Sequence, residues 1–513
     1  MGEPHPQRRR GVLAAALALA VLLLVPGGVF AWRSLDGAGT QPHDVLPADA
    51  VGYFRLDLDP SASQKIEAMR FLRKFPAIGD ALGGVADDED LRKRVIDEFT
   101  AATGCDIDFE ADVEPWLGDR LGGAMLPPTG EGTDPEFAVA LQIEDQDAAE
   151  ATIQQGLACG DPGADEFGRV YSDGYLILSD TQENAERHAA WAQESSLSSN
   201  SEFTEAMKLL GDQGVASMWF SSAGMFDAFE MPGAEMHPSD AFYDPDMPSM
   251  DDMRAMFEGA YRSVAMAFRF DSDYAEIASV ITGDAYTELS GGGVRADVPE
   301  DTTLLLGFAN GDSYLRENWE TLFEATPDQS RMIQGLAATA GLTFPDDLGT
   351  LFGENFVLTL DAQNVDIDAI TTYGDMSSVG LGALVDTDAD AAREVWEKLR
   401  RWAEWAEMPM DDLPLELTDD GYLIASSPEA GARLIEGGGL GDTDVYTTAV
   451  KDAANADAVF FVNVDTVEDL VTSFFDEPGN EDLVASLQAV QAIGYSAHIR
   501  DGHTEVTMRI TAN

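Results

Sequence analysis

Apolar and polar residues alternate along this chain in short runs, and one arrangement of these runs occurs twice. The pentapeptide Asp-Gly-Tyr-Leu-Ile is found at Asp173–Ile177 and again at Asp420–Ile424, and an amphipathic stretch follows each copy. Glycine favours tight turns, whereas tyrosine, leucine and isoleucine favour strands. Each copy therefore predicts a β-hairpin with its glycine in the turn, and the repeat indicates an internal duplication.

Other segments recur in the same order around the pentapeptide. The pairs are an acidic, proline-containing segment (Leu46–Asp49, Val298–Asp301), a strand (Phe137–Ile143, Val379–Val385) and a helix (Ala148–Leu157, Ala391–Ala406). Helices and strands alternate irregularly, and tight turns join many successive strands. This pattern predicts an α+β fold of two tandem related modules, residues 44–289 and 295–513, with mainly antiparallel sheets plus helices. The glycine-rich segment 290–294 is the predicted linker between them.

The N-terminal segment has a different pattern. Residues Gly11–Trp32 are apolar apart from one Pro-Gly-Gly break, and three consecutive arginines, Arg8–Arg10, precede them. As a helix this stretch would be about 33 Å long, enough for a hydrocarbon core of about 30 Å. The basic flank predicts a cytoplasmic tail (1–10), one transmembrane signal-anchor helix (11–32), a linker (33–43) and an extracytoplasmic remainder. A cleavable signal peptide with Leu13–Val25 as its apolar core is the alternative, and it places the remainder on the same side.

The overall charge excludes one class of partner. The chain of 513 residues carries 94 acidic and 30 basic residues, which gives a formal net charge of −64, while 45% of its residues are hydrophobic. The apolar share is large enough for a core, so the acids are predicted to lie on its surface. Such a surface repels nucleic acid and attracts cations and basic proteins. We favour solubility in salt as its role, with divalent cations and a basic protein partner as the alternatives.

Two acidic runs contain the oxygen ligands that calcium prefers. In Cys105–Pro115 the acids alternate, which puts them on one face of a predicted extended segment. The run that begins at Asp386 imitates the ligand spacing of an EF-hand loop, although Ala391 replaces its glycine. The candidate calcium ligands are Asp106, Asp108, Glu110, Asp112, Asp386, Asp388 and Asp390. A solvated strand face and helix N-capping also explain these acids, and we favour these explanations. The sequence suggests no other cofactor.

The chain has two cysteines, Cys105 and Cys159. In an exported protein an even pair of cysteines is more often a disulfide than a metal or redox site. We therefore predict a structural disulfide between them.

Short catalytic motifs are missing from the sequence. It has no G-x-S-x-G, no H-E-x-x-H and no P-loop, and its six histidines are scattered. No catalytic residue can be named, and an enzyme is not favoured. The leading hypothesis is a cell-surface protein that acts by binding or scaffolding. The alternatives are an envelope hydrolase that uses paired carboxylates, and a carrier of a lipid or another apolar ligand.

Three motifs behind the predicted anchor carry a family resemblance. They are L-P-A-D-A-V-G-Y-F-R-L-D-L-D-P at Leu46–Pro60, F-L-R-K-F-P at Phe71–Pro76 and D-V-E-P-W-L-G-D at Asp112–Asp119. As a set they resemble an uncharacterised, membrane-anchored bacterial family, domain of unknown function 3352, found mainly in high-GC Gram-positive organisms. The resemblance covers nearly all of the exported part. It implies a protein of the bacterial cell envelope, and it brings no known reaction or catalytic residues.

Overall fold

The described part of the chain forms two compact units. The computed structural model describes residues 39–58, 62–75, 92–93, 96, 100, 105–128, 135–159, 167–222, 224, 261–284, 286–289, 291–324, 334–335, 337–362, 379–405, 415–468, 472 and 481–513. Unit 1 holds most residues up to Ala285, and unit 2 holds Tyr286–Asn513 with two short earlier segments. The predicted anchor at 11–32 lies outside the described residues. Among those residues, no helix is both long and apolar enough to cross a membrane.

Unit 1 is an antiparallel sheet with helices. Its strands are β1 (Gly52–Asp57), β2 (Leu117–Leu126), β3 (Glu136–Ile143), β4 (Gly168–Ser172), β5 (Tyr175–Ser179), β6 (Ala216–Ser221), β7 (Ser263–Phe270) and β8 (Tyr274–Thr282). Its helices are η2 (Pro42–Asp44), α2 (Ala62–Leu72), the π-helical turn η3 (Phe109–Val113), α5 (Gln146–Cys159), α6 (Gln182–Glu194), η5 (Leu197–Ser199) and α7 (Ser201–Leu210). The strands follow the order β4-β5-β3-β2-β1-β6-β7-β8.

Unit 2 has the same kind of sheet. Its strands are β9 (Leu304–Ala309), β10 (Asn355–Asp361), β11 (Gly380–Asp386), β12 (Leu415–Thr418), β13 (Gly421–Ala425), β14 (Ala458–Asn463), β15 (Val490–Arg500) and β16 (His503–Ala512). Its helices are α10 (Gly311–Glu324), α12 (Asp346–Phe352), α14 (Ala389–Trp405), α15 (Pro428–Glu436), η7 (Leu440–Asp442), α16 (Asp444–Ala449), η8 (Ala453–Asn455), η9 (Val464–Val467) and α18 (Glu481–Gln488). The strands follow the order β12-β13-β11-β10-β9-β14-β15-β16.

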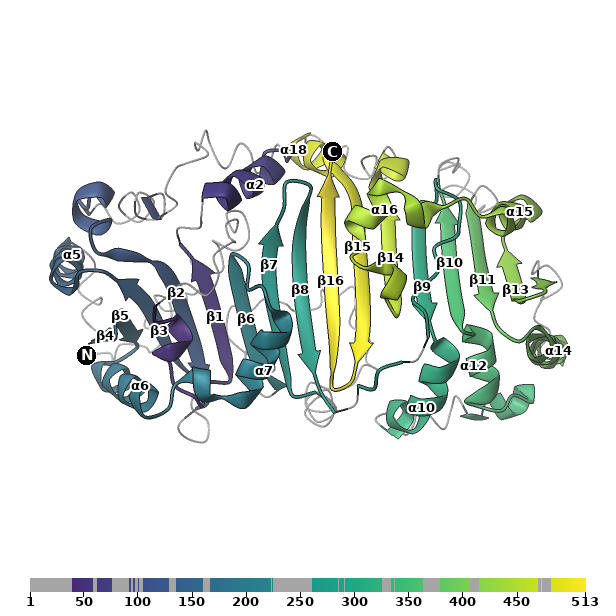
Figure 1. Ribbon diagram of the computed structural model, residues 1–513, viewed down its shortest axis with the longest axis horizontal. Coiled ribbons are helices and arrows are strands. Elements are labelled where there is room, and N and C mark those ends of the chain that lie inside the picture. Colours follow the sequence, from purple (N-terminus) through teal and green to yellow (C-terminus); the bar gives the residue numbers. More distant parts are fainter. Residues whose placement is uncertain are drawn as a thin grey trace, which may run out of the picture. The chain divides into compact units, whose positions relative to one another are not determined.

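The strand orders of the two units are identical. If the strands are counted from one within each unit, both sheets have the order 4-5-3-2-1-6-7-8, so the first strand lies inside the sheet (Figure 1). The α+β class and the antiparallel pairing predicted from the sequence are confirmed. The predicted strands at Phe137–Ile143 and Val379–Val385 are confirmed as β3 and β11, and the helices predicted after them are confirmed as α5 and α14.

Both faces of the unit 1 sheet carry a core. On what we call the α7 face, α7 lies across β6 and β7 (Figure 1), and the ring of Phe203 packs edge-to-face on Tyr53 and Trp219 at centroid distances of 5.1 and 5.6 Å. The alternation along β3 separates the two cores, because Ala140 belongs to this cluster and Leu141 to the other. The second cluster, on the α5 face, is built around η3 and α5.

Unit 2 repeats this division. Its α16 face is packed by Tyr446 of α16 edge-to-face on Phe461 of β14, with a centroid distance of 5.1 Å. On its α14 face, Trp396 of α14 packs edge-to-face on Tyr422 of β13, with a centroid distance of 5.4 Å. Each sheet is therefore covered on both faces, which requires strands that are apolar on both sides.

The repeated acidic segments have one shared structural role. The carbonyl oxygen of Leu46 accepts a hydrogen bond from the Leu197 N–H at 2.8 Å, and that of Val298 accepts one from the Leu440 N–H at 3.1 Å. In both units the segment before the first strand thus accepts a hydrogen bond from the first N–H of a 3-10 helix, which has no partner within that helix. This 3-10 helix precedes α7 in unit 1 and α16 in unit 2.

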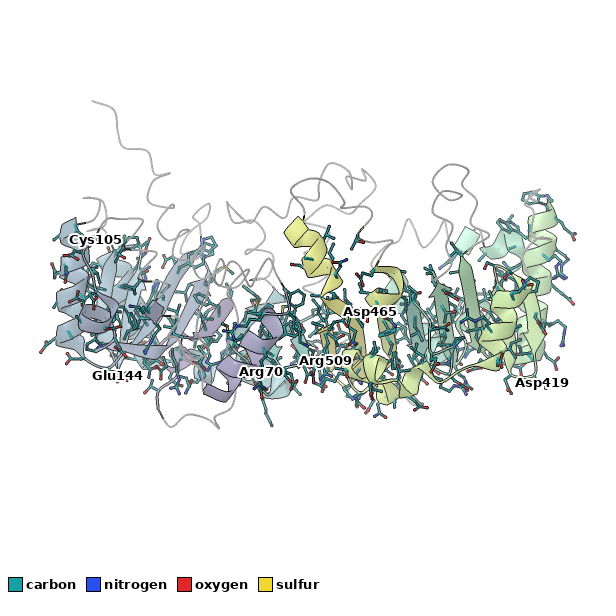
Figure 2. The ribbon with its side chains drawn as sticks, turned by 90° about the horizontal axis from the view of Figure 1, so that it is seen from above. Arg70, Cys105, Glu144, Asp419, Asp465 and Arg509 are labelled. Carbon is teal, nitrogen blue, oxygen red and sulfur yellow. A yellow bond between two sulfur atoms is a disulfide. The ribbon has the colours of Figure 1, made fainter. Side chains whose placement is uncertain are left out.

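The two copies of the pentapeptide fold differently. In unit 1, Ser172 pairs with Tyr175, so the turn is Asp173–Gly174, and both turn residues have positive φ, 49° and 82°. This is the two-residue turn that matches the twist of a hairpin. In unit 2, Thr418 pairs with Gly421, so the turn is Asp419–Asp420 (Asp419 is labelled in Figure 2).

The prediction that both glycines lie in the turn is therefore right for Gly174 and wrong for Gly421. Gly421 is the first residue of β13, with φ 149°, and a Cβ atom there would lie 2.0 Å from the carbonyl oxygen of Val385. Only glycine allows this approach, and the turn of unit 2 lies one residue earlier than the turn of unit 1. A shift of one residue exchanges the faces of a strand. Tyr175 accordingly lies on the α7 face, and Tyr422 lies on the α14 face.

Candidate functional site

The first candidate calcium run is not extended. Residues Phe109–Val113 form a π-helical turn, with Asp108 as its N-cap, which accepts a hydrogen bond from the Ala111 N–H at 2.8 Å. The side chain of Asp112 accepts the Asp108 N–H at 2.9 Å. The prediction of one extended carboxylate face is therefore wrong, since these acids satisfy the backbone of a tight turn.

Asp106 and Glu110 also have other roles in this run. The carbonyl of Asp106 accepts a hydrogen bond from the side chain of Gln155 on α5 at 2.6 Å. Glu110 lies 3.7 Å from the ammonium group of Lys93, and its side chain is 73% exposed. The run is thus joined to neighbouring helices by pairwise contacts.

The acids of the second candidate run form ion pairs and a helix cap around the start of α14. Asp386 forms an ion pair with Arg295, and Asp390 forms one with Arg393. The side chain of Asp388 accepts the Ala391 N–H at 2.8 Å, which is a helix N-cap. Among the described residues, no three Asp, Glu, His or Cys side chains are grouped as metal ligands. Calcium binding stays a prediction, since capping accounts for the contact of Asp388 and ion pairs account for those of Asp386 and Asp390.

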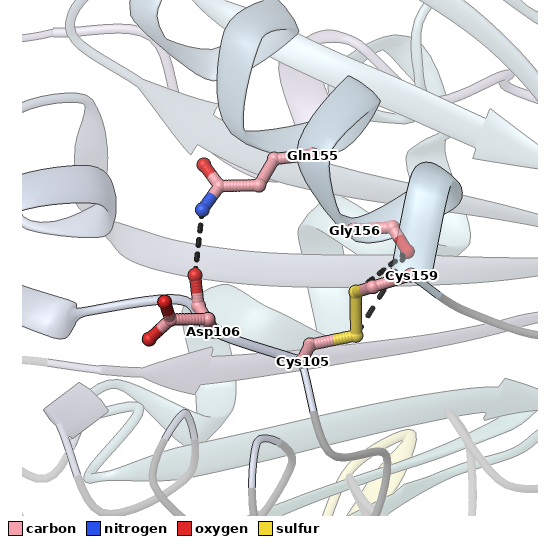
Figure 3. Close-up of a disulfide and its surroundings, with 5 residues drawn as sticks. All are labelled: Cys105, Asp106, Gln155, Gly156 and Cys159. Atoms are coloured by element: carbon pink, nitrogen blue, oxygen red, sulfur yellow. Dashed lines mark hydrogen bonds between the residues drawn. A yellow bond between two sulfur atoms is a disulfide. The ribbon is translucent and has the colours of Figure 1, made fainter.

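Cys105 and Cys159 form a disulfide (Figure 3). Their Cα atoms are 5.5 Å apart across a sequence separation of 54 residues, and the bond joins the chain before η3 to the last residue of α5. Figure 2 labels Cys105 beside this helix. The bond fixes η3 against α5, which is where Trp116 donates a hydrogen bond to Thr152 at 3.1 Å.

A cluster of polar and charged side chains in unit 1 connects β3 with α6. Glu136, the first residue of β3, lies 2.8 Å from Nε2 of His188 and also pairs with Arg187. Nδ1 of His188 lies 3.4 Å from Oγ of Ser179. Serine, histidine and a carboxylate are the groups of a hydrolase triad, but Ser179 and His188 are both 0% exposed. A substrate cannot reach this serine, so the cluster fills space between a strand and a helix.

The same place in unit 2 is a cavity. It has a volume of about 170 Å³ and lies between the ends of β10 and β11 and the start of α15. Its walls combine apolar groups, hydroxyls and charges. The lining residues are Pro299, Thr302, Thr359, Leu360, Asp361, Val379, Gly380, Gly382, Ser427, Glu429, Ala430, Arg433 and Leu434. All of them belong to unit 2.

Cross-strand pairing identifies which residues correspond. Leu126 of β2 is paired with Glu136, and at the matching end of unit 2 Asp361 of β10 is paired with Gly380. The glycine therefore occupies the place of the glutamate. In the helix that follows, His188 lies seven residues after the N-cap Thr181, as Leu434 lies seven residues after the N-cap Ser427. The side chains that fill this place in unit 1 are replaced by smaller or apolar ones.

Arg433 connects two elements at the cavity. Its guanidinium pairs with Asp301, which precedes β9, and with Asp361 at the end of β10. Burial acts to lower the pKa of Arg433, but the two carboxylates outweigh it and the pKa is raised. Both acids have therefore a cationic partner. Within the part of the chain that the structure describes, Glu429 forms no ion pair, and its side chain is exposed at the cavity.

The start of α15 is poorly suited to an anion. Pro428, the first residue of the helix, has no N–H, and the Ala430 N–H is bonded to Oγ of Ser427 at 3.1 Å. The Gly431 N–H is bonded to the carbonyl of Ser427 at 3.0 Å. The remaining N–H of the first turn belongs to Glu429, whose carboxylate repels anions. The cavity therefore favours a neutral or cationic ligand.

The sequence prediction missed this site. Its signal is the Gly380-Leu381-Gly382 run, because alternate residues of a strand share a face and two glycines leave that face without side chains. The signal is visible only when the two copies are aligned by structure. Aligned by the pentapeptide, the copies are one residue out of register at the N-caps Thr181 and Ser427, and three residues out of register at Glu136 and Gly380.

One family model matches part of this chain. Residues 12–166 match a family model described as "Protein of unknown function (DUF3352)". The predicted resemblance to domain of unknown function 3352 is thus confirmed for these residues, which are fewer than the nearly complete exported part that we expected. The bacterial source and the membrane anchor stay predictions. No curated protein and no solved structure matches the chain.

Proposed function

We propose that the protein is a membrane-anchored binding protein of the cell envelope, and that the cavity of unit 2 is its ligand site. The observation that carries this proposal is the contrast between corresponding positions. Unit 1 closes the place with Glu136 and His188, whereas unit 2 leaves about 170 Å³ open around Gly380. This difference between two otherwise similar folds indicates that the opening has its own use, since small ligands bind in concave sites of this kind.

The location of the protein is part of the proposal. The apolar segment at 11–32, with Arg8–Arg10 before it, supports an anchor with the folded units outside the cytoplasm. The disulfide Cys105–Cys159 supports the same side, because disulfides persist in oxidising compartments.

The contacts at the cavity favour binding over hydrolysis or lipid transport. Asp301 and Asp361 are both bound to Arg433, so neither is placed as a free proton donor for glycoside chemistry. A lipid carrier needs an enclosed apolar space for acyl chains. This cavity is smaller than typical ligand pockets, about 300–1,000 Å³, and carries charges at its mouth.

The test combines location and binding. Intact cells that express the full chain are treated with protease, and degradation without lysis is the expected result. The purified full chain in detergent is then melted with small polar compounds that are cationic, neutral or anionic. We expect at least one class to raise the melting temperature of the wild type in a saturable way, and not that of Gly380→Glu, which restores the unit 1 side chain. A protected chain, or no class that distinguishes the two proteins, would refute the proposal.

A further inference from the structure

We infer that the cavity of unit 2 binds a primary alkylammonium group, such as a lysine side chain or a free aliphatic amine. This inference rests on the proposed function and names the chemistry of its ligand. The charges at the site indicate that the ligand is positively charged. Glu429, Asp361 and Arg433 line the cavity, and the guanidinium of Arg433 pairs with Asp361 and with Asp301 beside it. Glu429 forms no ion pair with other described residues. A cationic ligand would give Glu429 a partner.

The walls of the cavity indicate an organic cation with an aliphatic stem. Leu360, Val379 and Leu434 are apolar lining residues, and Gly380 and Gly382 add backbone without side chains. Calcium would need six to eight oxygen ligands, which walls of this kind do not supply. A ligand with a linear carbon chain would pack that chain against these apolar residues and place its charged end at Glu429.

The type of cation follows from the absence of aromatic rings. Quaternary ammonium groups are recognised by cages of aromatic side chains. None of the described residues that line the cavity is aromatic. A compact primary ammonium instead donates hydrogen bonds to carboxylates, as the site offers.

The backbone at the site permits a precise blocking variant. Gly380 has no positive φ, and a Cβ atom there would meet Cβ of Asp361 at 3.2 Å, so a larger residue is tolerated by the strand with a small adjustment. Glutamate at the corresponding position of unit 1 shows that the fold accepts it. Glu429→Gln is the second variant, because it removes charge without changing size.

The experiment is calorimetric titration of the purified full chain in detergent. The probes are n-butylamine, 1,5-diaminopentane and Nα-acetyl-lysine methylamide, with n-butanol, butyrate and tetramethylammonium as comparison compounds. We expect saturable binding of the primary amines only, at least tenfold weaker for Glu429→Gln and absent for Gly380→Glu. Glu416→Gln, an exposed charge change on β12, is the matched control and should bind as the wild type does. Melting curves verify that each variant is folded.

The outcomes separate the inference from the proposed function. If Glu416→Gln and Glu429→Gln weakened amine binding equally, the inference would be overturned, because the amines would then be attracted to the acidic surface in general. Butanol or butyrate that binds wild type but not Gly380→Glu would also overturn it and leave the proposed function standing. No binding by any probe would overturn both. Tighter binding of the lysine derivative indicates a polypeptide source, and tighter binding of the diamine indicates a free amine; both support the inference.

Discussion

Tyr175 and Tyr422 occupy the same position of a repeated pentapeptide, yet they lie on opposite faces of their sheets. Tyr175 donates its hydroxyl hydrogen to the carbonyl of Thr40 at 2.8 Å, beside the α7 face. Tyr422 donates to the carbonyl of Leu351 in α12, on the α14 face. The cause is the one-residue difference in turn position, which inverts every side chain of β13 relative to β5.

The first prediction follows from this inversion. Tyr175→Phe and Tyr422→Phe should each lower the free energy of unfolding by about 1 kcal/mol, through loss of one hydrogen bond. Hydrogen exchange should increase near η2 in the first variant and in α12 in the second. If both substitutions loosened the same layer of their units, the assignment of faces would be wrong.

The second prediction concerns the disulfide. Replacing Cys105 and Cys159 together by serine should lower the free energy of unfolding by about 4 kcal/mol, because the bond closes a loop of 54 residues in the unfolded chain. Urea denaturation of the two proteins measures the difference. The wild type in the presence of a reductant is the control and should behave as the double variant does. Rapid alkylation of both sulfurs in denatured, unreduced protein would contradict the bond.

The third prediction is a pH dependence. Burial lowers the pKa of His188 from its usual value of about 6.5, and Glu136 offsets this only in part. Below about pH 6.5 the unfolded chain therefore binds a proton that the folded chain does not, so stability should fall as the pH falls from 7 to 5. Thermal melting over this range measures the slope.

The variant His188→Gln is the comparison for this prediction. Glutamine does not titrate, so the slope of stability against pH should be smaller than in the wild type, even if the variant is less stable overall. An unchanged slope would assign the pH dependence to other groups.

The fourth prediction separates capping from calcium binding at α14. Asp388→Ala should lower the free energy of unfolding by about 1 kcal/mol, whereas Asp388→Asn should cost a few tenths at most, because asparagine is an equally good N-cap. Melting with and without Ca²⁺ is the measurement. A saturable gain with Ca²⁺ in the wild type that disappears in Asp388→Asn would instead support a metal site.

Some features of the fold could be predicted from local chemistry. The strands and helices after the acidic segments, and the antiparallel α+β class, follow from periodicity and turn residues. The order of strands does not, because it is determined by contacts between residues far apart in the sequence. The position of Gly421 illustrates the limit. Its requirement for glycine comes from the carbonyl of Val385 on a neighbouring strand, which no local pattern reveals.

The candidate site was less predictable than the fold. The acids that imitate calcium ligands, such as Asp108 and Asp388, are common at helix starts, and the abundance of acids makes chance spacings frequent. The cavity depends on which residues are small, Gly380 and Gly382, and on a histidine replaced by Leu434. Such a cavity forms where side chains are small or missing, whereas sequence motifs identify sites by the side chains that they contain.

The interior position of the first strand affects how each unit is made. β1 pairs with β2 on one side and with β6 on the other, and β6 is synthesised long after β2. While the chain emerges, one edge of β1 therefore remains open until the last third of the unit arrives. A polypeptide with this connectivity benefits from a chaperone that shields that edge until β6 has been synthesised.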